Sequence, residues 1–216
     1  MKNLGVLWDM DGVIVDTGKF HFLSWMKTFE ESGVPFDEKV FNRTFGMNNT
    51  DILEWVLGYK PDPDEIARVS DRKESIFRQL ITGKAELLPG IKKWLDYFNE
   101  NGAKQAIASS APIKNIEVLL DELSINHLFD VIVSGAELPG KPNPDVFLKV
   151  AEAIGIPPER CIVIEDAIAG VEGAKRAGMG CIAVTTTNPA EKLAKADLVF
   201  THLEEMSEHE LLSLIE

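Results

Sequence analysis

The chain has 216 residues, of which 45% are hydrophobic, and its 22 basic and 35 acidic side chains give a net charge of -13 at pH 7. This length fits one domain or a core with a modest insertion, and the negative charge argues against nucleic acid and anionic membrane surfaces as partners. No apolar run is long enough for a secretory leader or a membrane span, so we expect a cytoplasmic protein.

The two cysteines, Cys161 and Cys181, lie in apolar runs about one helix apart. Because they do not form a CxxC pair, we expect two buried, reduced thiols in a reducing compartment. A disulfide between neighbouring strands remains the alternative.

The chain opens with an apolar run, residues 4–8, that leads into Asp9 and Asp11. A short apolar run bounded by turn residues predicts a buried strand, and acidic groups at the end of such a strand lie where open α/β sheets bind ligands. Asp11-Gly12 between two apolar runs is also a typical hairpin signal. This stretch alone therefore supports a turn and a functional site about equally.

The next seventy residues or so contain no strand-like stretch. Apolar residues at helical spacing predict helices over 19–32, 37–45, 49–57 and 62–80, with Gly33 and Gly46 as breaks. Because this segment leaves the first strand at the edge where a ligand would bind, we expect it to lie over the ligand crevice as a cap.

From Pro89-Gly90 onward, short strands alternate with helices. We expect strands at 105–108, 130–133, 161–164, 180–184 and 198–200, and helices at 91–101, 112–123, 144–154, 167–177 and 208–215. This alternation predicts an α/β fold with a Rossmann-like parallel sheet and helices on both faces. The expected organisation is an α/β core of residues 1–16 and 88–216, interrupted by an all-helical cap of residues 17–87.

Four short polar sequences follow four successive strands of the expected core. They are Asp9-Met-Asp11, Ala108-Ser-Ser-Ala111, Gly140-Lys-Pro-Asn-Pro144 and Ile164-Glu-Asp166. In a parallel sheet the loops that follow the strands share one edge, so these four groups can converge.

The residue types in these loops suit phosphoryl transfer. Crowded carboxylates need a cation, and oxygen ligands suit a hard ion such as Mg²⁺. Ser109 and the helix that follows it offer hydrogen-bond donors to phosphate, and Lys141 offers positive charge. One of the two aspartates, Asp9 or Asp11, can attack phosphorus while the other donates and accepts a proton, and their order in the sequence does not decide which.

Together these motifs resemble the haloacid dehalogenase superfamily, and within it the β-phosphoglucomutase-like phosphatase branch. The matching stretches are residues 9–17, Ser109, residues 141–145 and residues 164–178, and they cover nearly the whole core in order. The resemblance implies that Asp9 is the nucleophile and a Mg²⁺ ligand. It implies that Asp11 is the general acid/base, with its backbone carbonyl on the metal.

The resemblance also implies that Ser109 and Lys141 hold the transferring phosphate and that Glu165 and Asp166 lie in the metal shell, Asp166 being the stronger candidate. Dehalogenases of the superfamily typically lack an acid at the position of Asp11. The presence of that acid therefore indicates action on a phosphate ester and not on a carbon–halogen bond.

The helical segment contains the candidates for substrate binding. Thr17, His21 and Trp25 match the Asp-Thr-x-x-x-His-x-x-x-Trp stretch of β-phosphoglucomutase, and Lys73 lies where that mutase's cap supplies a substrate-contacting lysine. Packing explains His21 about as well as substrate contact does, and it explains Trp25 better. Ser110, in the loop after the second core strand, is a further substrate-binding candidate.

Three positions depart from the mutase pattern. In Gly46-Met-Asn-Asn-Thr50, Asn49 stands where the mutase has a phosphate-gripping arginine, and an asparagine does not supply that charge. Ala111 and Pro112 replace a serine and a lysine of the mutase's phosphate loop. Asn49 itself remains a candidate for substrate contact.

These departures favour a Mg²⁺-dependent phosphatase that acts on a small phosphorylated metabolite, with a sugar phosphate as the favoured substrate class. Lys73 or Lys114 could restore the missing charge, so a phosphosugar mutase is the alternative. A non-catalytic binding or regulatory protein on the same fold is a third interpretation, against which the intact acids argue. The sequence does not predict the leaving group or the oligomeric state.

Overall fold

The computed structural model describes residues 1–45 and 47–215 of the chain. In these residues six strands form one parallel sheet in the order β3-β2-β1-β4-β5-β6. The strands are β1 (Gly5–Trp8), β2 (Lys104–Ser109), β3 (Val131–Ser134), β4 (Cys161–Glu165), β5 (Gly180–Val184) and β6 (Leu198–Phe200). The expected α/β fold with a Rossmann-like sheet is confirmed, and β1 lies near its middle.

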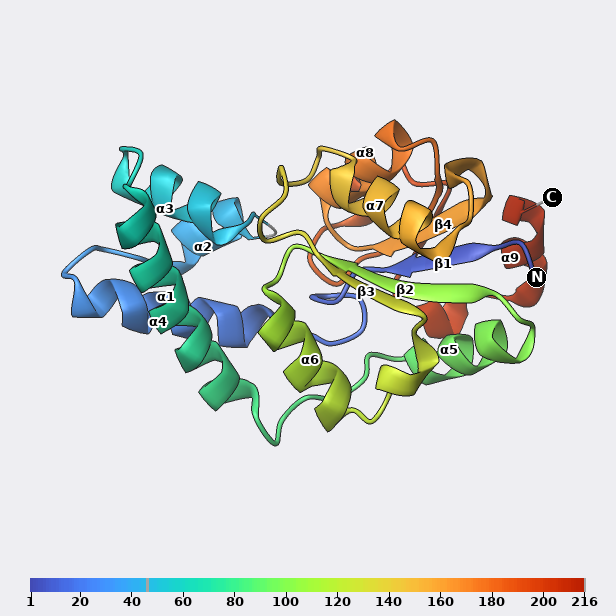
Figure 1. Ribbon diagram of the computed structural model, residues 1–216, viewed down its shortest axis with the longest axis horizontal. Coiled ribbons are helices and arrows are strands. Elements are labelled where there is room, and N and C mark those ends of the chain that lie inside the picture. The colour runs from blue at the N-terminus through green and yellow to red at the C-terminus, as the bar shows by residue number, and fades with distance from the viewer. Residues whose placement is uncertain (46, 216) are drawn as a thin grey trace.

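Helices cover both faces of this sheet (Figure 1). They are α5 (Ile91–Glu100), α6 (Ile113–Glu122), α7 (Asp145–Ile154), α8 (Ile168–Arg176) and α9 (Glu208–Ile215). Successive side chains of a strand point to opposite faces, so Trp8 packs in one apolar cluster with Trp94 of α5, while Leu7 packs in another with Phe147 of α7. The sheet is therefore buried on both faces, as its nearly continuous apolar strands require.

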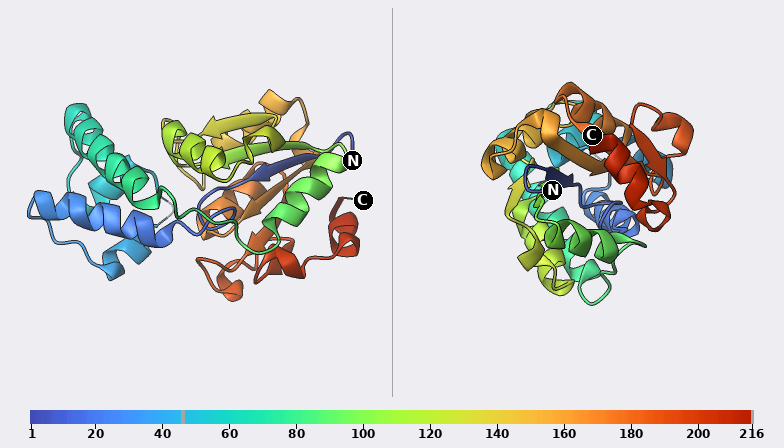
Figure 2. Two further views of the ribbon diagram at one scale, coloured as in Figure 1. Left: turned by 90° about the horizontal axis from the view of Figure 1, so that it is seen from below. Right: turned by 90° about the vertical axis from the view of Figure 1, so that its right-hand side faces the viewer.

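The helices between β1 and α5 gather beyond one end of the sheet, and both ends of the described chain lie at the opposite end (Figures 1 and 2). They are α1 (Gly18–Glu31), α2 (Glu38–Thr44), α3 (Asn49–Leu57) and α4 (Pro63–Ile81). They share an apolar cluster that includes Trp25, Phe29 and Leu53. Gly46, predicted to separate two helices, lies outside the described residues.

Helix α4 contributes to two apolar clusters. Val69, near its start, packs with Trp25 and Leu53 among the helices of its own segment. Phe77 and Ile81, near its end, pack in the cluster that also contains Trp8 of the sheet. The two halves of α4 thus belong to different parts of the molecule.

The chain leaves β1 through a tight turn. Gly12 has φ +83°, in the left-handed region that favours glycine, and its N–H donates to the carbonyl of Val15 at 2.8 Å. Asp11 and Val15 form an isolated bridge and not a ladder of paired strands. Asp11-Gly12 is therefore a turn beside the sheet and not the tip of a β-hairpin.

Cys161 and Cys181 are both buried and free of a disulfide, as expected. Burial raises the pKa of the Cys161 thiol to about 11, and Glu159 adds to that shift. Among the described residues, no helix combines the length and apolarity that a membrane span needs.

Candidate active site

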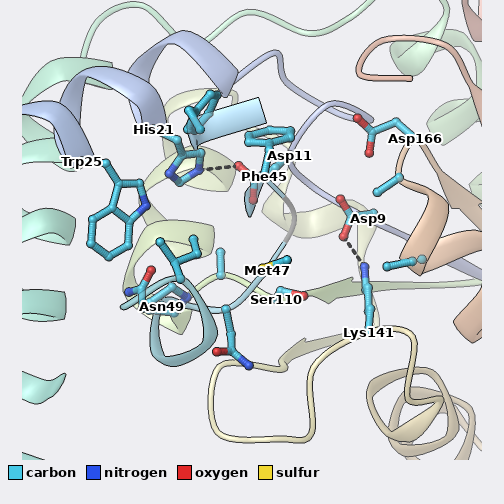
Figure 3. Close-up of a pocket in the computed structure, with 18 of the residues that line it drawn as sticks. Asp9, Asp11, His21, Trp25, Phe45, Met47, Asn49, Ser110, Lys141 and Asp166 are labelled. Carbon is cyan, nitrogen blue, oxygen red and sulfur yellow. Dashed lines mark hydrogen bonds and ion pairs between the residues drawn. The ribbon is translucent and has the colours of Figure 1, made fainter. Parts of the chain in front are cut away.

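A pocket lies where the strand-end loops face helices α1 to α4, and Figure 3 shows its lining side chains. Of the predicted site residues, those that line it are Asp9, Asp11, His21, Trp25, Asn49, Lys73, Ser110, Lys141, Glu165 and Asp166. Groups from four strand ends and from the helical segment thus meet in one place, as the parallel topology requires. Thr17 and Ser109 are not in the lining but lie directly behind it, each bonded to a residue of the lining.

The ammonium group of Lys141 contacts three oxygen atoms at the base of the pocket. Its Nζ lies 2.6 Å from Asp9 Oδ1 and 2.6 Å from Glu165 Oε1, and it donates to the carbonyl of Ala108 at 3.3 Å. Burial alone would lower the pKa of this lysine, but Asp9 and Glu165 outweigh burial and raise it. Lys141 is therefore a fixed positive charge beside Asp9.

Glu165 is engaged on both carboxylate oxygens. Oε1 accepts from Lys141, and Oε2 accepts from the N–H groups of Asp166 and Ala167 at 2.8 Å each. Gly170 makes room for this carboxylate, because a Cβ there would lie 1.8 Å from Oε1. Glu165 thus positions Lys141 and has little capacity left for another ligand.

Asp9, Glu165 and Asp166 offer oxygens that all lie within 4.8 Å of one another. Burial and the neighbouring carboxylates raise the pKa of Asp166 well above its ordinary value. Burial chiefly raises the pKa of Asp9 to about 7, against the opposing effect of Lys141. This crowding of buried oxygens fits a hard dication such as Mg²⁺, and since Glu165 is already engaged, Asp9 and Asp166 are the side chains best placed to hold it.

The turn after β1 approaches Asp166 closely. A Cβ on Gly12 would lie 2.0 Å from Asp166 Oδ2, which also accepts a hydrogen bond from Thr187 Oγ1. Thr187 was not predicted as a site residue. It follows β5, and so lies at the same sheet edge as the predicted groups.

Asp11 is oriented away from the carboxylate cluster and toward the helical segment (Figure 3). Its Oδ1 accepts from Thr17 Oγ1 and lies 3.0 Å from His21 Nε2. Burial alone would raise the pKa of Asp11, but His21, Thr17 and Lys73 outweigh burial and lower it. The two aspartates therefore experience different environments, which shift their pKa values in opposite directions.

His21 connects Asp11 to the helical segment. Lys73 Nζ lies 2.9 Å from His21 Nδ1, and the imidazole stacks on Phe77 with centroids 4.1 Å apart. An ammonium group only donates, so Nδ1 must accept and the ring proton must be on Nε2, which donates to Asp11. Lys73 thus fixes the tautomer through which His21 binds Asp11.

Lys73 and the adjacent Glu74 are charged yet only 2% and 4% exposed. Glu74 Oε1 accepts from Lys73 Nζ at 2.9 Å and from Asn49 Nδ2 at 2.7 Å. Burial opposes ionisation of Glu74, but Lys73, His21 and Asn49 outweigh it and lower its pKa. Glu74 was missed as a site residue, because a Glu on an amphipathic helix is normally solvated.

The two serines at the end of β2, Ser109 and Ser110, differ in their surroundings. Ser109 is buried, and its Oγ accepts from the N–H of Ala111 at 3.0 Å, which leaves its hydroxyl hydrogen as a donor. Ser110 lines the pocket together with Ala111 and Pro112. Among the described lining residues the cations are Lys73 and Lys141, and both already contact carboxylates.

Residues 6–184 match the family model of the haloacid dehalogenase-like hydrolases. The match covers most of the chain, so this protein belongs to that family of hydrolytic enzymes, and its relatives place it in the β-phosphoglucomutase-like branch. The resemblance expected from the motifs is confirmed, and so is the prediction of an enzyme of hydrolase type.

Among curated relatives, the chain is 35% identical to β-phosphoglucomutase of Bacillus subtilis, covering 90% of this chain and 87% of the relative. It is 32% identical to phosphorylated carbohydrates phosphatase of Thermotoga maritima, covering 90% and 91%. It is 31% identical to the chloroplastic 5-amino-6-(5-phospho-D-ribitylamino)uracil phosphatase of Arabidopsis thaliana over 94% of this chain, but spans only 56% of that relative.

Among solved structures, β-phosphoglucomutase from Clostridium difficile superimposes with a TM-score of 0.89 at 28% identity, covering 100% of this chain and 97% of the other. Relatives named as phosphatases and as mutases thus match this chain at similar identities, between 28% and 35%. The family is established, and the choice between the two reactions depends on the pocket.

Proposed function

We propose that this protein is a Mg²⁺-dependent phosphatase that hydrolyses a small phosphorylated metabolite, with a sugar phosphate as the favoured substrate class, through an aspartyl phosphate. The observation that carries the proposal is the pairing of Asp9 with Lys141 beside Asp166, next to an Asp11 held in a different environment. A cationic side chain, a carboxylate nucleophile and a separate acid/base are the groups that phosphoryl transfer needs.

In the first half-reaction, an Asp9 oxygen attacks phosphorus, a bond forms from Asp9 to phosphorus, and the bond from phosphorus to the leaving oxygen breaks. Asp11 gives its proton to that oxygen. Lys141 and the Ser109 hydroxyl hold the phosphate oxygens as charge develops on them. Mg²⁺, held by Asp9, Asp166 and the backbone carbonyl of Asp11, would supply further charge neutralisation.

In the second half-reaction, water attacks the phosphorus of the aspartyl phosphate. Asp11 takes a proton from that water, and the bond between Asp9 and phosphorus breaks to release inorganic phosphate. Asp11 has given up its proton in the first half-reaction, and its lowered pKa favours the ionised form that accepts a proton in this step. His21 and Thr17 hold the carboxylate in place by donating to it.

The helical segment, residues 17–87, serves in this proposal as the cap that excludes bulk water and selects the substrate. His21, Trp25, Asn49 and Lys73 would meet the leaving group from the cap side, and Ser110 from the core side. Apolar side chains of the cap, Phe41, Phe45, Met47 and Ile52, also line the pocket. This mixture suits a compact organic phosphate.

Phosphatase is favoured over mutase because a mutase must grip a second phosphate. Asn49 donates to Glu74 where an arginine would be needed, and Ala111 and Pro112 offer no charge. Lys114, considered as a substitute cation, is not among the lining residues. The mutase relatives keep that activity as the outcome to test against.

The proposal is tested with purified protein, Mg²⁺ and a panel of phosphorylated sugars and other small metabolites, by measuring release of inorganic phosphate. We expect turnover of at least one ester, and D9N should abolish it while leaving the circular dichroism spectrum unchanged. Isomerisation of β-glucose 1-phosphate faster than phosphate release would replace the phosphatase with the mutase. A wild-type protein that turns over no member of the panel would favour the non-catalytic alternative.

A further inference from the structure

Helix α4 and the core helix α6 are joined by a buried polar contact. Asn115, in the first turn of α6, is only 1% exposed. Its Nδ2 donates to Glu74 Oε2 at 2.5 Å, and its Oδ1 accepts from Arg78 Nη1 at 2.8 Å. Both polar atoms of one core amide are thus used by two side chains one turn apart on α4.

The contact reaches the pocket through the other oxygen of Glu74. Oε1 accepts from Lys73 and from Asn49, which both line the pocket. Lys73 in turn fixes the His21 tautomer that donates to Asp11. A continuous path of hydrogen bonds therefore runs from Asn115 of the core, through the helical segment, to the carboxylate of Asp11.

The contact between Glu74 and Asn115 lies between the two parts of α4 that pack in different apolar clusters. Phe77 and Ile81, C-terminal to Glu74, pack into the apolar cluster of the sheet, whereas Val69 packs with the other helices of its segment. Glu74 is thus near the point where α4 passes from the core to the helices over the pocket. The hydrogen bond between Glu74 and Asn115 therefore holds α4 against the core beside Lys73, which lines the pocket.

An amide is the group that this contact requires. Ionised Glu74 needs a donor and Arg78 needs an acceptor, and Asn115 supplies one of each. An aspartate would place a second carboxylate against Glu74, and a leucine would leave a buried carboxylate without its partner, which is costly.

We propose that Asn115 is a positioning residue of this enzyme. By holding Glu74, it sets the places of Lys73 and Asn49 over the pocket and, through Lys73 and His21, the hydrogen bonding of Asp11. The part of this inference that concerns turnover rests on the proposed phosphatase activity. The part that concerns His21 does not.

The decisive test is a swap of the two side chains. N115D should lower kcat/KM by about tenfold or more, as expected for loss of a hydrogen bond to a charged group. In E74Q/N115D the introduced amide donates to the introduced carboxylate and still accepts from Lys73 and Asn49. The double variant should therefore recover most of the loss of N115D, and failure to recover it would overturn the proposal.

A matched control separates positioning from general destabilisation. Gln105 is an equally buried amide in the core, and its side chain is bonded to Trp8 and to the carbonyl of Leu95 and not to α4. Q105M should lower the unfolding midpoint and leave kcat/KM within about twofold of wild type. N115L should lower kcat/KM even when compared at equal fractions folded, and a wild-type value for it would contradict the proposal.

A second measurement needs no substrate. In protein labelled with ¹⁵N-histidine, the two imidazole nitrogen shifts of His21 report which nitrogen carries the proton. N115L should change these shifts at constant pH, and Q105M should not. If the wild type hydrolyses no ester, the phosphatase proposal fails while this measurement still tests Asn115, and unchanged His21 shifts in N115L would refute the positioning role.

Discussion

Gly170 makes room for the carboxylate that holds Lys141. It lies in the first turn of α8, where alanine would normally stabilise a helix by up to about 1 kcal/mol. A Cβ at this position would lie 1.8 Å from Glu165 Oε1, and the carboxylate is held on its other side by Lys141 and two backbone N–H groups. The Glu165 side chain therefore cannot move aside without breaking hydrogen bonds to Lys141 or to the backbone.

We therefore expect G170A to lower the free energy of unfolding by about 1–3 kcal/mol and to reduce kcat, because displaced Glu165 no longer fixes Lys141. Urea denaturation and phosphate release measure the two effects. G180A is the control, since its nearest contact would be an ordinary 3.5 Å. Equal stability of the two variants would contradict the steric argument.

Glu74 is a residue whose charge should be visible in the pH dependence of stability. Its pKa is lower in the folded chain than the ordinary value of 4.5, because Lys73, His21 and Asn49 outweigh the effect of burial. A carboxylate shifted in this direction stabilises the fold above its unfolded pKa, and that stabilisation is lost as the pH falls through the folded pKa.

E74Q does not titrate at this position. The difference in unfolding free energy between wild type and E74Q should therefore be greatest near pH 7 and should shrink as the pH falls below 4.5. Urea denaturation at several pH values measures it. A difference that stays constant from pH 7 into this acidic range would show that the charge of Glu74 contributes nothing.

At the scale of elements, the helices over the pocket begin with side chains that cap them. Asn48 Oδ1 accepts from the N–H of Asp51 at 2.9 Å at the start of α3, and Asp62 Oδ1 accepts from that of Glu65 at 2.8 Å at the start of α4. These are equivalent contacts in different places, because Asn48 lines the pocket and Asp62 is exposed.

Replacement of either capping residue should cost about 1 kcal/mol of stability. D62A should keep the wild-type kcat/KM, whereas N48A should lower it, because only Asn48 lines the pocket. Thermal unfolding and steady-state kinetics on the same preparations check this pair. Equal kinetics for both variants would show that Asn48 acts only as a cap.

The elements themselves could be predicted closely from the sequence. The pattern predicts a helix over 49–57, and α3 is Asn49–Leu57; it predicts one over 19–32, and α1 is Gly18–Glu31. The convergence of Asp9, Lys141 and Asp166 was also predictable, since strand order in a parallel sheet determines which loops share an edge.

The contacts of Glu74 could not be predicted in this way. Helical periodicity indicates which face of α4 is apolar, yet Lys73 and Glu74 are charged and buried. Glu74 is satisfied by Asn49 and Asn115, which are 25 and 41 residues away in the chain. Partners at such separations follow from how two helices cross, and a single sequence holds no signal for that crossing.

At the scale of the whole molecule, the crowded carboxylates predict that stability depends on a bound cation. If Asp9 and Asp166 hold Mg²⁺, the ion binds the folded chain and not the unfolded one. Mg²⁺ at a hundred times its dissociation constant would then add about 2.7 kcal/mol to the unfolding free energy.

We expect added Mg²⁺ to raise the unfolding midpoint of the wild type and to raise that of D166N much less, while a chelator should abolish phosphate release. D96N, which alters an exposed carboxylate paired with Lys92, should respond as the wild type does. Differential scanning fluorimetry at constant ionic strength measures the shift. An equal response of D166N would remove Asp166 from the metal site.

Because α4 packs in two apolar clusters, its division also determines where the helical segment can be exchanged for another. The chain enters and leaves the helical segment near residues 17 and 87, but the packing changes between Val69 and Phe77, well inside the helix. Excising the segment at its chain ends would remove Phe77 and Ile81 from the apolar cluster of the sheet domain and leave a void in it. A chimera that exchanges this segment for another would therefore keep the last two turns of α4 with the sheet and place the junction within the helix.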